Sequence, residues 1–271
     1  MIRTVANGVS IRYDDQGPSD GIPVVLVHGH PFDHTLWAPQ VTALTAAGYR
    51  VVTPDLRGYG GSEVVPGACL LSDHADDIAA LLDTIGLDRV VVGGVSMGGQ
   101  ITMEFQRTHP ERVRALVLSD TSPVAETDEG KAFRNALADR LLAEGMGGYA
   151  DEVIDKMIAP YNVTALPDVA EHVLAMMRGT APEGAAAALR GRAERPDYRD
   201  TLARTSVPVL VVVGADDFYT PVSDARATHS LIPSAELVVI EQAGHLPGAE
   251  QPAAFNDALL AFLRTRVAVH G

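Results

Sequence analysis

Apolar residues along the chain follow two alternating patterns. Short continuous apolar runs alternate with longer stretches in which apolar residues recur at spacings of three and four. A continuous run is typical of a strand buried on both faces of a parallel sheet, and the second spacing is typical of an amphipathic helix. Strands are therefore predicted within residues 23–27, 50–53, 90–92, 113–118, 207–213 and 236–240, after an opening hairpin that includes 9–13.

The alternation of these strands with helices predicts the architecture. Helices are expected at 35–48, 72–85, directly after residue 96, and at 222–231 and 252–266. Strands and helices in regular alternation build a doubly wound, mostly parallel sheet, here with eight strands. The fold class is therefore predicted as α/β.

The alternation is interrupted between Ser122 and Ser206, where strand-like runs are lacking. This connection is far longer than an ordinary crossover. Its spacing predicts helices at 131–145, 149–158, 169–177 and 184–192. We expect a helical cap, residues 122–206, inserted after the sixth strand of a core formed by 1–121 and 207–271.

The turn at residues 93–99 has the pattern of a nucleophile elbow, Gly-x-Ser-x-Gly between a strand and a helix. A strand that turns directly into a helix brings neighbouring backbone so close that glycine is needed on both sides. Gly94 and Gly98 occupy these positions. Ser96 lies between them, at the N-terminus of the following helix, where backbone N–H groups favour negative charge. Ser96 is the predicted nucleophile.

With this elbow and three further motifs, the sequence resembles the α/β-hydrolase superfamily along nearly its whole length. The motifs occur in the order that the superfamily requires: His28-Gly29, Gly94-Val95-Ser96-Met97-Gly98, Gly214-Ala215-Asp216-Asp217-Phe218-Tyr219-Thr220-Pro221 and Gly244-His245. The resemblance implies the α/β-hydrolase fold and a catalytic triad of Ser96, Asp217 and His245. In such a triad the imidazole takes the serine proton, and a buried carboxylate orients the imidazole and stabilises its charged form.

Two other aspartates compete with Asp217 for the role of the acid. Asp216 is adjacent, and the Gly-x-x-Asp-x-x-Thr-Pro pattern favours Asp217, leaving Asp216 to support the loop. Asp120 ends the sixth strand, where some relatives carry the acid, but a turn or cap before Ser122 explains it as well.

The resemblance also implies an oxyanion hole, because a developing oxyanion needs preorganised donors. The donors are the backbone N–H groups of Met97 and His30. Many relatives have an aromatic residue where this chain has His30, a departure that makes the pocket wall more polar. His28 is interpreted as a structural residue of its loop.

The composition limits the kinds of molecule that the protein is expected to bind. The formal net charge is −14, and such a surface repels nucleic acid and anionic lipid. Cys69 is the single cysteine, which excludes an internal disulfide and a multi-cysteine metal site. The chain lacks the apolar run of about 20 residues that a membrane helix needs, and its start lacks a secretory pattern. We expect a cytoplasmic protein without metal or cofactor, either a monomer or a homodimer.

These observations predict a serine hydrolase that cleaves a small carboxylic ester or lactone through an acyl-enzyme. The segment from Phe133 to Tyr149 resembles the β-ketoadipate enol-lactonase group, and the His-Gly-x-Pro loop resembles cofactor-free perhydrolases. Ser96 argues against dehalogenation, which uses a carboxylate nucleophile in this superfamily. A carbon–carbon bond hydrolase, a perhydrolase and a non-catalytic ligand receptor on the same fold are the alternatives.

Overall fold

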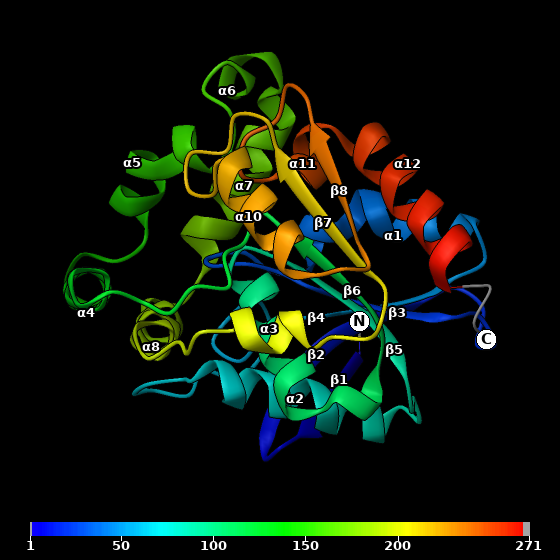
Figure 1. Cartoon of the computed structure of the whole chain (residues 1–271). Coiled ribbons are helices and arrows are strands. Elements are labelled where there is room, and N and C mark those ends of the chain that lie inside the picture. Colours follow the sequence, from blue (N-terminus) through cyan, green and yellow to red (C-terminus); the bar gives the residue numbers. More distant parts are fainter. Residues whose placement is uncertain (1, 268–271) are drawn as a thin grey trace.

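The computed structural model describes residues 2–267, and an eight-stranded sheet forms their centre (Figure 1). The strand order is β1-β2-β4-β3-β5-β6-β7-β8, with β1 and β2 antiparallel to their neighbours and the other pairings parallel. The predicted doubly wound, mostly parallel sheet is confirmed. The strands are β1 Ile2–Ala6, β2 Val9–Gln16, β3 Pro23–Val27, β4 Arg50–Pro54, β5 Val90–Val95, β6 Val113–Ser119, β7 Val209–Gly214 and β8 Ala235–Ile240.

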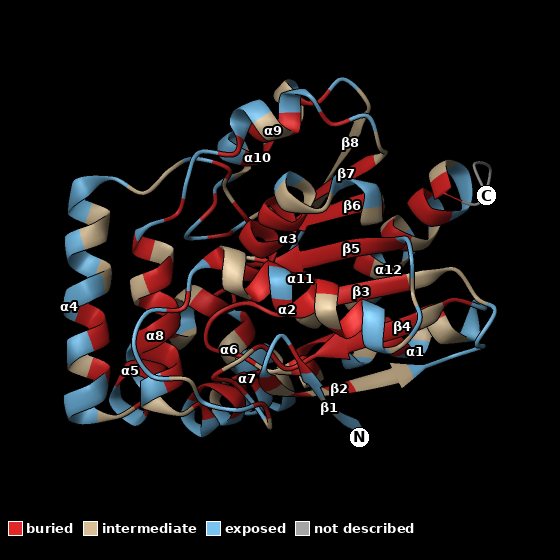
Figure 2. Ribbon diagram, turned by 90° about the horizontal axis from the view of Figure 1, so that it is seen from below, coloured by how far each residue is buried: buried red, intermediate tan, exposed pale blue. Residues whose placement is uncertain are grey.

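Helices cover both faces of the sheet, so that its central strands, β3 to β7, are almost wholly buried (Figure 2). Val24 and Leu26 of β3 belong to one apolar cluster, whereas Val25 and Val27 belong to the other, because successive side chains of a strand point to opposite faces. One face is covered by α1 Ala38–Ala46, α11 Pro247–Glu250 and α12 Pro252–Phe262, and the other by α2 Leu71–Thr84, α3 Met97–Thr108 and α10 Val222–Leu231. Three short elements complete this part: η1 His34–Trp37, η2 Pro110–Arg112 and η3 Leu263–Val267.

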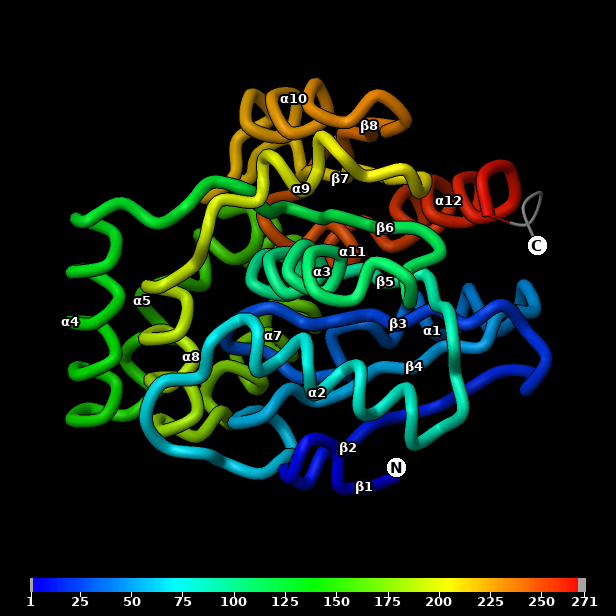
Figure 3. The backbone as a smooth tube through the Cα atoms, turned by 60° about the horizontal axis from the view of Figure 1, so that its bottom comes forward, coloured from blue at the N-terminus to red at the C-terminus, as the bar shows by residue number. Residues whose placement is uncertain are grey.

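Between β6 and β7 the chain forms only helices: α4 Asp128–Glu144, α5 Gly147–Met157, α6 Asn162–Ala165, α7 Pro167–Gly179, α8 Pro182–Ala193 and α9 Arg199–Ala203. The four helices expected here are present, together with the short helices α6 and α9. Figure 3 shows α4, α5 and α8 grouped together beyond one end of the strands, whereas α9 packs against α3 and α10.

Helix α8 lies very close to the loops at Gly58 and Cys69, because its residues at the two contacts are glycines, which have no side chain to keep the backbones apart. A Cβ at Gly184 would come within 1.9 Å of the Gly58 carbonyl oxygen, and one at Gly191 within 1.5 Å of the Cys69 carbonyl oxygen. These two close approaches hold the backbone of α8 against the loops at Gly58 and Cys69. None of the described helices is both long and apolar enough to cross a membrane.

Candidate active site

The turn from β5 into α3 holds Ser96 in a strained backbone conformation, with φ 57° and ψ −118°. Its neighbours must be glycines: a Cβ at Gly94 would lie 2.2 Å from the Gly98 carbonyl carbon, and a Cβ at Gly98 would lie 2.1 Å from the Val27 carbonyl oxygen. Strain of this kind persists only where the surrounding structure enforces it, and it is concentrated at functional sites. The turn therefore has the tight strand-to-helix geometry expected from the sequence.

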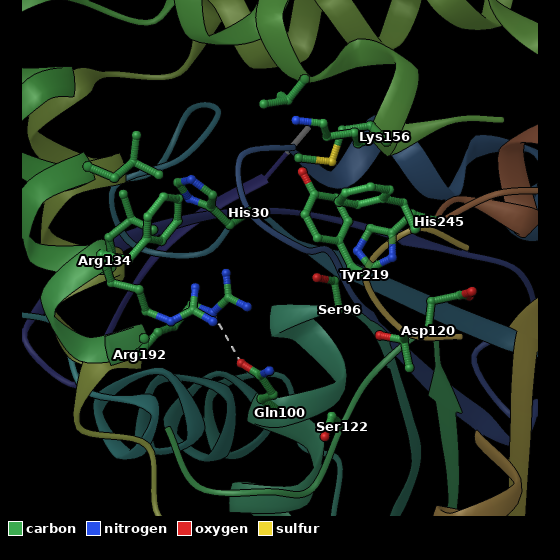
Figure 4. A pocket seen from close by; sticks show the side chains of 18 of the residues that line it. His30, Ser96, Gln100, Asp120, Ser122, Arg134, Lys156, Arg192, Tyr219 and His245 are labelled. Atoms are coloured by element: carbon green, nitrogen blue, oxygen red, sulfur yellow. Dashed lines mark hydrogen bonds between the residues drawn. The ribbon is translucent and has the colours of Figure 1, made fainter. Parts of the chain in front are cut away.

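His245 and Asp217 meet at the same edge of the sheet, in the loops that follow β8 and β7. The His245 Nδ1 lies 2.9 Å from each carboxylate oxygen of Asp217. Both residues are buried, with 3% and 6% of their surface exposed. Because Nδ1 is bonded to the carboxylate, Nε2 is the nitrogen left for proton exchange. Ser96 and His245 line one cavity, and Figure 4 shows them near each other at one end of it.

Asp120, the first rival acid, lies beside Asp217 at the end of β6. It is also buried, and its backbone has a positive φ of 49°. Its Oδ1 accepts a hydrogen bond of 2.8 Å from the Gly214 N–H, and its Oδ2 accepts one of 2.5 Å from the Ser119 hydroxyl. Burial, followed by the nearby charge of Asp217, raises the pKa of Asp120 well above its usual range. Asp120 thus joins β6 to β7, and its surroundings favour the neutral carboxyl group.

Asp216, the second rival, is exposed. Its carboxylate accepts a hydrogen bond of 2.6 Å from the Tyr161 hydroxyl. This bond links the loop after β7 to the segment between β6 and β7, which agrees with the supporting role expected for Asp216.

The loop after β3 lies against the elbow. A Cβ at Gly29 would be 3.2 Å from the Ser96 Cβ, so the next residue, His30, is also close to the nucleophile position. Met97 is the first residue of α3, and the N–H groups of a helix's first turn have no partner within the helix. The two backbone groups expected to form an oxyanion hole therefore come from segments that flank Ser96.

His28 has the structural position that the sequence analysis expected. Its Nδ1 donates to the Gly29 carbonyl at 2.9 Å, and its Nε2 accepts from the Leu56 N–H at 3.0 Å. Both ring nitrogens are therefore used within the loop, and neither is free to act on a substrate.

Glu250, which the sequence analysis did not single out, organises the loop that carries His245. Its buried carboxylate accepts hydrogen bonds from the Gly244 and Leu246 N–H groups, which flank His245, at 2.9 and 3.2 Å. It also accepts from the Ala159 N–H and the Asn162 amide, each at 2.8 Å. The sequence gives no signal for this role, because two of the four donors, from Ala159 and Asn162, come from a distant segment.

The cavity that contains Ser96 has a volume of about 600 Å³. One wall comes from the loops at the carboxyl ends of the strands, the usual place for a ligand in an open α/β sheet. The opposite wall comes from α4, α5 and α8, through residues that include Phe133, Leu137, Tyr149, Val153 and Leu189. Apolar side chains therefore face the nucleophile position across a space large enough for a small organic molecule.

Two clusters contain side chains of the type that bind metals: Asp33, His34 and Asp55, and Asp120, Asp217 and His245. In the first, Asp55 already accepts hydrogen bonds from the His34 ring at 2.7 Å and from the Gly61 N–H at 2.7 Å. In the second, Asp217 is bonded to His245. These mutual hydrogen bonds account for the grouping of side chains in both clusters, and the absence of a metal or cofactor stays a prediction.

Comparison with known proteins gives consistent matches over nearly the whole chain. The model of the alpha/beta hydrolase family matches residues 24–258. A non-heme chloroperoxidase of Streptomyces lividans is 32% identical over 97% of this chain and 99% of its own length. The 3-oxoadipate enol-lactonase 1 of Acinetobacter baylyi is 27% identical over 97% of this chain and 96% of its own. A thermophilic esterase from Thermogutta terrifontis, solved with malate bound, is 38% identical with a TM-score of 0.94, covering 98% of both chains.

Proposed function

The chain belongs to the alpha/beta hydrolase family, and from this premise we propose that it hydrolyses small carboxylic esters or lactones through an acyl-enzyme on Ser96. The observation that carries the proposal is the buried His245–Asp217 pair, which lines the same cavity as a serine on a strained strand-to-helix turn. Relatives named as an esterase and an enol-lactonase support this class of reaction.

In the proposed mechanism, the Ser96 oxygen attacks the carbonyl carbon while the His245 Nε2 takes the hydroxyl proton. Asp217 holds the ring through Nδ1 and stabilises the imidazolium. The oxyanion receives hydrogen bonds from the backbone N–H groups of Met97 and His30. His245 then gives its proton to the leaving alkoxide, and a water molecule activated by the same ring releases the acid.

We further propose that residues 122–206 act as a cap that selects the substrate. Helices α4, α5 and α8 supply the cavity wall that faces Ser96. The residues proposed to carry the chemistry all come from outside this segment. Chemistry and selection would thus reside in separate parts of the chain.

A second candidate activity is perhydrolysis, in which hydrogen peroxide instead of water attacks the acyl-enzyme and a peracid leaves. The similarity to a non-heme chloroperoxidase favours it. Formation of peracetic acid from acetate and hydrogen peroxide, measured against 4-nitrophenyl acetate hydrolysis, would rank the two activities.

The central test compares the wild-type protein with Ser96→Ala. We expect the wild type to release 4-nitrophenol from 4-nitrophenyl acetate or butyrate over many turnovers, and a fluorophosphonate to label it once per chain, at Ser96. Ser96→Ala should fold normally and lose both properties. Stoichiometric labelling without turnover would favour a ligand receptor, and more than a few per cent residual activity in the variant would exclude the acyl-enzyme.

A further inference from the structure

The cavity beside Ser96 is cationic although the protein as a whole carries a net charge of −14. Two acidic residues line it, Glu152 and Asp120, and the raised pKa of Asp120 favours its neutral form. Five basic side chains also line it: Arg134, Arg140, Lys156, Arg192 and Arg195. An acidic protein that gathers positive charge around one interior space favours an anion there.

Most of these basic groups are compensated by neighbours. Arg140 pairs with Glu144 and Glu152. The ammonium of Lys156 lies 5.4 Å from the centre of the Phe218 ring. Lys156 of α5 and Arg140 of α4 therefore have partners within the protein, and neither needs a ligand to compensate its charge.

The deeper group is different, because one carboxylate compensates only two of its three arginines. Arg134 and Arg195 both pair with Glu126, which is itself largely buried. Arg192 forms no ion pair with any carboxylate in residues 2–267; its Nε donates to the Gln100 side-chain oxygen at 3.1 Å. Figure 4 shows the guanidinium groups of Arg134 and Arg192 close together in the cavity. Arg192 is therefore a cation without a counter-ion.

This arrangement destabilises the charged form of Arg192. Burial, followed by the charges of Arg134 and Arg195, lowers its pKa well below the usual range. A guanidinium nevertheless keeps its proton in proteins. An anion that enters the cavity would remove the repulsion and gain two planar N–H forks that match a carboxylate.

His30 supplies a second, independent sign of a ligand. Its imidazole is 4% exposed and lines the cavity, and its Nε2 is buried without a hydrogen-bond partner among the described residues. Its Nδ1 lies 2.8 Å from the Tyr59 hydroxyl. Burial and the nearby Arg192 and Arg134 lower the pKa of His30, so the ring is neutral. When Tyr59 donates to Nδ1, the Nε2 carries hydrogen and is a donor that lacks an acceptor.

We propose that Arg192, Arg134 and His30 form a subsite for a carboxylate carried by the substrate, at a distance from the bond that is cleaved. The proposal rests on the ester or lactone hydrolysis described above and narrows it: the substrate is an ester or lactone with a second, ionised carboxyl group. A carboxylate is favoured over a phosphate dianion because Arg192 is the single guanidinium of the three without a carboxylate partner.

The test uses matched pairs of 4-nitrophenyl esters. The 4-nitrophenyl monoesters of succinate, glutarate and adipate carry the charge, and the esters of the corresponding monoamides have the same shape without it. We expect wild-type kcat/KM to favour the charged ester of the best-fitting length by at least about tenfold, as one charge-assisted hydrogen-bond pair would give. High salt should reduce this ratio. Equal values, or a preference for the amide, would overturn the proposal.

Arg192→Gln should lower the ratio of charged to neutral ester to about one, mainly through KM for the charged ester. The ratio is measured within one preparation, so it does not depend on the fraction of active protein. Arg190→Gln is the matched control: it lies on the same helix, pairs with Asp139 and does not line the cavity. A ratio that falls equally in Arg190→Gln, or stays unchanged in Arg192→Gln, would contradict the assignment.

A binding measurement separates this proposal from the proposed function and covers the case of an unstable variant. Glutarate should inhibit hydrolysis of neutral esters competitively in the wild type, whereas glutaramate and inorganic phosphate should be much weaker. Glutarate should also raise the Tm of Ser96→Ala, which does not turn over. If glutarate stabilises the protein but the wild type has no esterase activity, the proposed function is refuted and the subsite is not. If glutarate and glutaramate have equal effects, the subsite is refuted and the proposed function is not. Stronger inhibition by phosphate would overturn the choice of a carboxylate.

Discussion

Asp120 and Asp217 lie side by side below the imidazole of His245, yet hydrogen bonds from Nδ1 go to Asp217. The two carboxyl oxygens of Asp120 accept hydrogen bonds from the Gly214 N–H and the Ser119 hydroxyl. Burial, together with the nearby charge of Asp217, raises the pKa of Asp120. The two neighbouring carboxyl groups therefore have different surroundings: burial favours the neutral form of Asp120, whereas Asp217 accepts hydrogen bonds from the His245 ring. We therefore expect opposite responses to the same substitution.

Asp217→Asn should lower kcat for 4-nitrophenyl butyrate by roughly 10⁴-fold, because the amide cannot stabilise the imidazolium and favours the wrong tautomer. Asp120→Asn replaces one neutral group by another of nearly the same shape, and should retain kcat within about tenfold. Asp216→Asn, which changes only a bond to Tyr161, should cost on the order of 1 kcal/mol. Three turnover numbers decide the assignment. A collapse in Asp120→Asn with normal activity in Asp217→Asn would move the acid to the end of β6.

Glu250→Gln should lower kcat and stability together. The carboxylate accepts four hydrogen bonds, and an amide would place its own N–H₂ against one pair of these donors. A buried unmet donor costs roughly 1–3 kcal/mol in unfolding free energy. We expect a lower midpoint of urea unfolding and a reduced kcat with KM nearly unchanged, since Glu250 does not line the cavity.

Glu241→Gln, the same substitution at an exposed position in the loop that follows β8, is the matched control. Loss of stability in Glu250→Gln without any fall in kcat would show that Glu250 supports the fold but does not position His245.

His74 predicts an acid-sensitive step in stability. Burial, followed by the charge of Arg57, lowers its pKa to about 3, and its Nε2 lies 3.2 Å from the Cys69 sulfur. The unfolded value is 6.5, so below that pH the unfolded chain binds the extra proton and stability falls as the pH falls toward 3. Between pH 6.5 and 4 the wild type should lose roughly 3 kcal/mol more than His74→Phe, at about 1.4 kcal/mol per pH unit.

Urea unfolding at several pH values measures this difference. His172→Gln, which removes an exposed histidine, should lose stability in parallel with the wild type. Parallel curves for His74→Phe and the wild type would show that His74 does not couple folding to pH.

The cap proposal predicts that α4 and α5 control selectivity. Replacing residues 128–157 by a flexible linker keeps Ala159 and Asn162, which bind Glu250, and keeps α8, which contacts the sheet-forming part at Gly184 and Gly191. KM values for longer acyl chains should rise and the order of preference should change, while kcat for 4-nitrophenyl acetate stays within about tenfold. Loss of the near-ultraviolet circular dichroism signal would show instead that these helices belong to the core.

The sequence by itself determined the features that depend on neighbouring residues. The apolar runs marked the strands of the sheet, and the spacing of Gly94, Ser96 and Gly98 marked a turn whose steric demands are local. The order of the motifs was enough to select Asp217 and His245 as partners. In each case a few consecutive residues carry the physical constraint.

Only the tertiary structure decided which distant groups share one environment. It brought Arg134 of α4, Arg192 of α8 and Gln100 of α3 to one cavity, Asn162 to Glu250, and Asp120 to Asp217. Whether an arginine has a counter-ion or a carboxyl group keeps its proton depends on burial and on charges a few ångströms away. These neighbours are tens of residues apart in the chain, and the packing of α8 and the pairing of β6 with β7 set their separations.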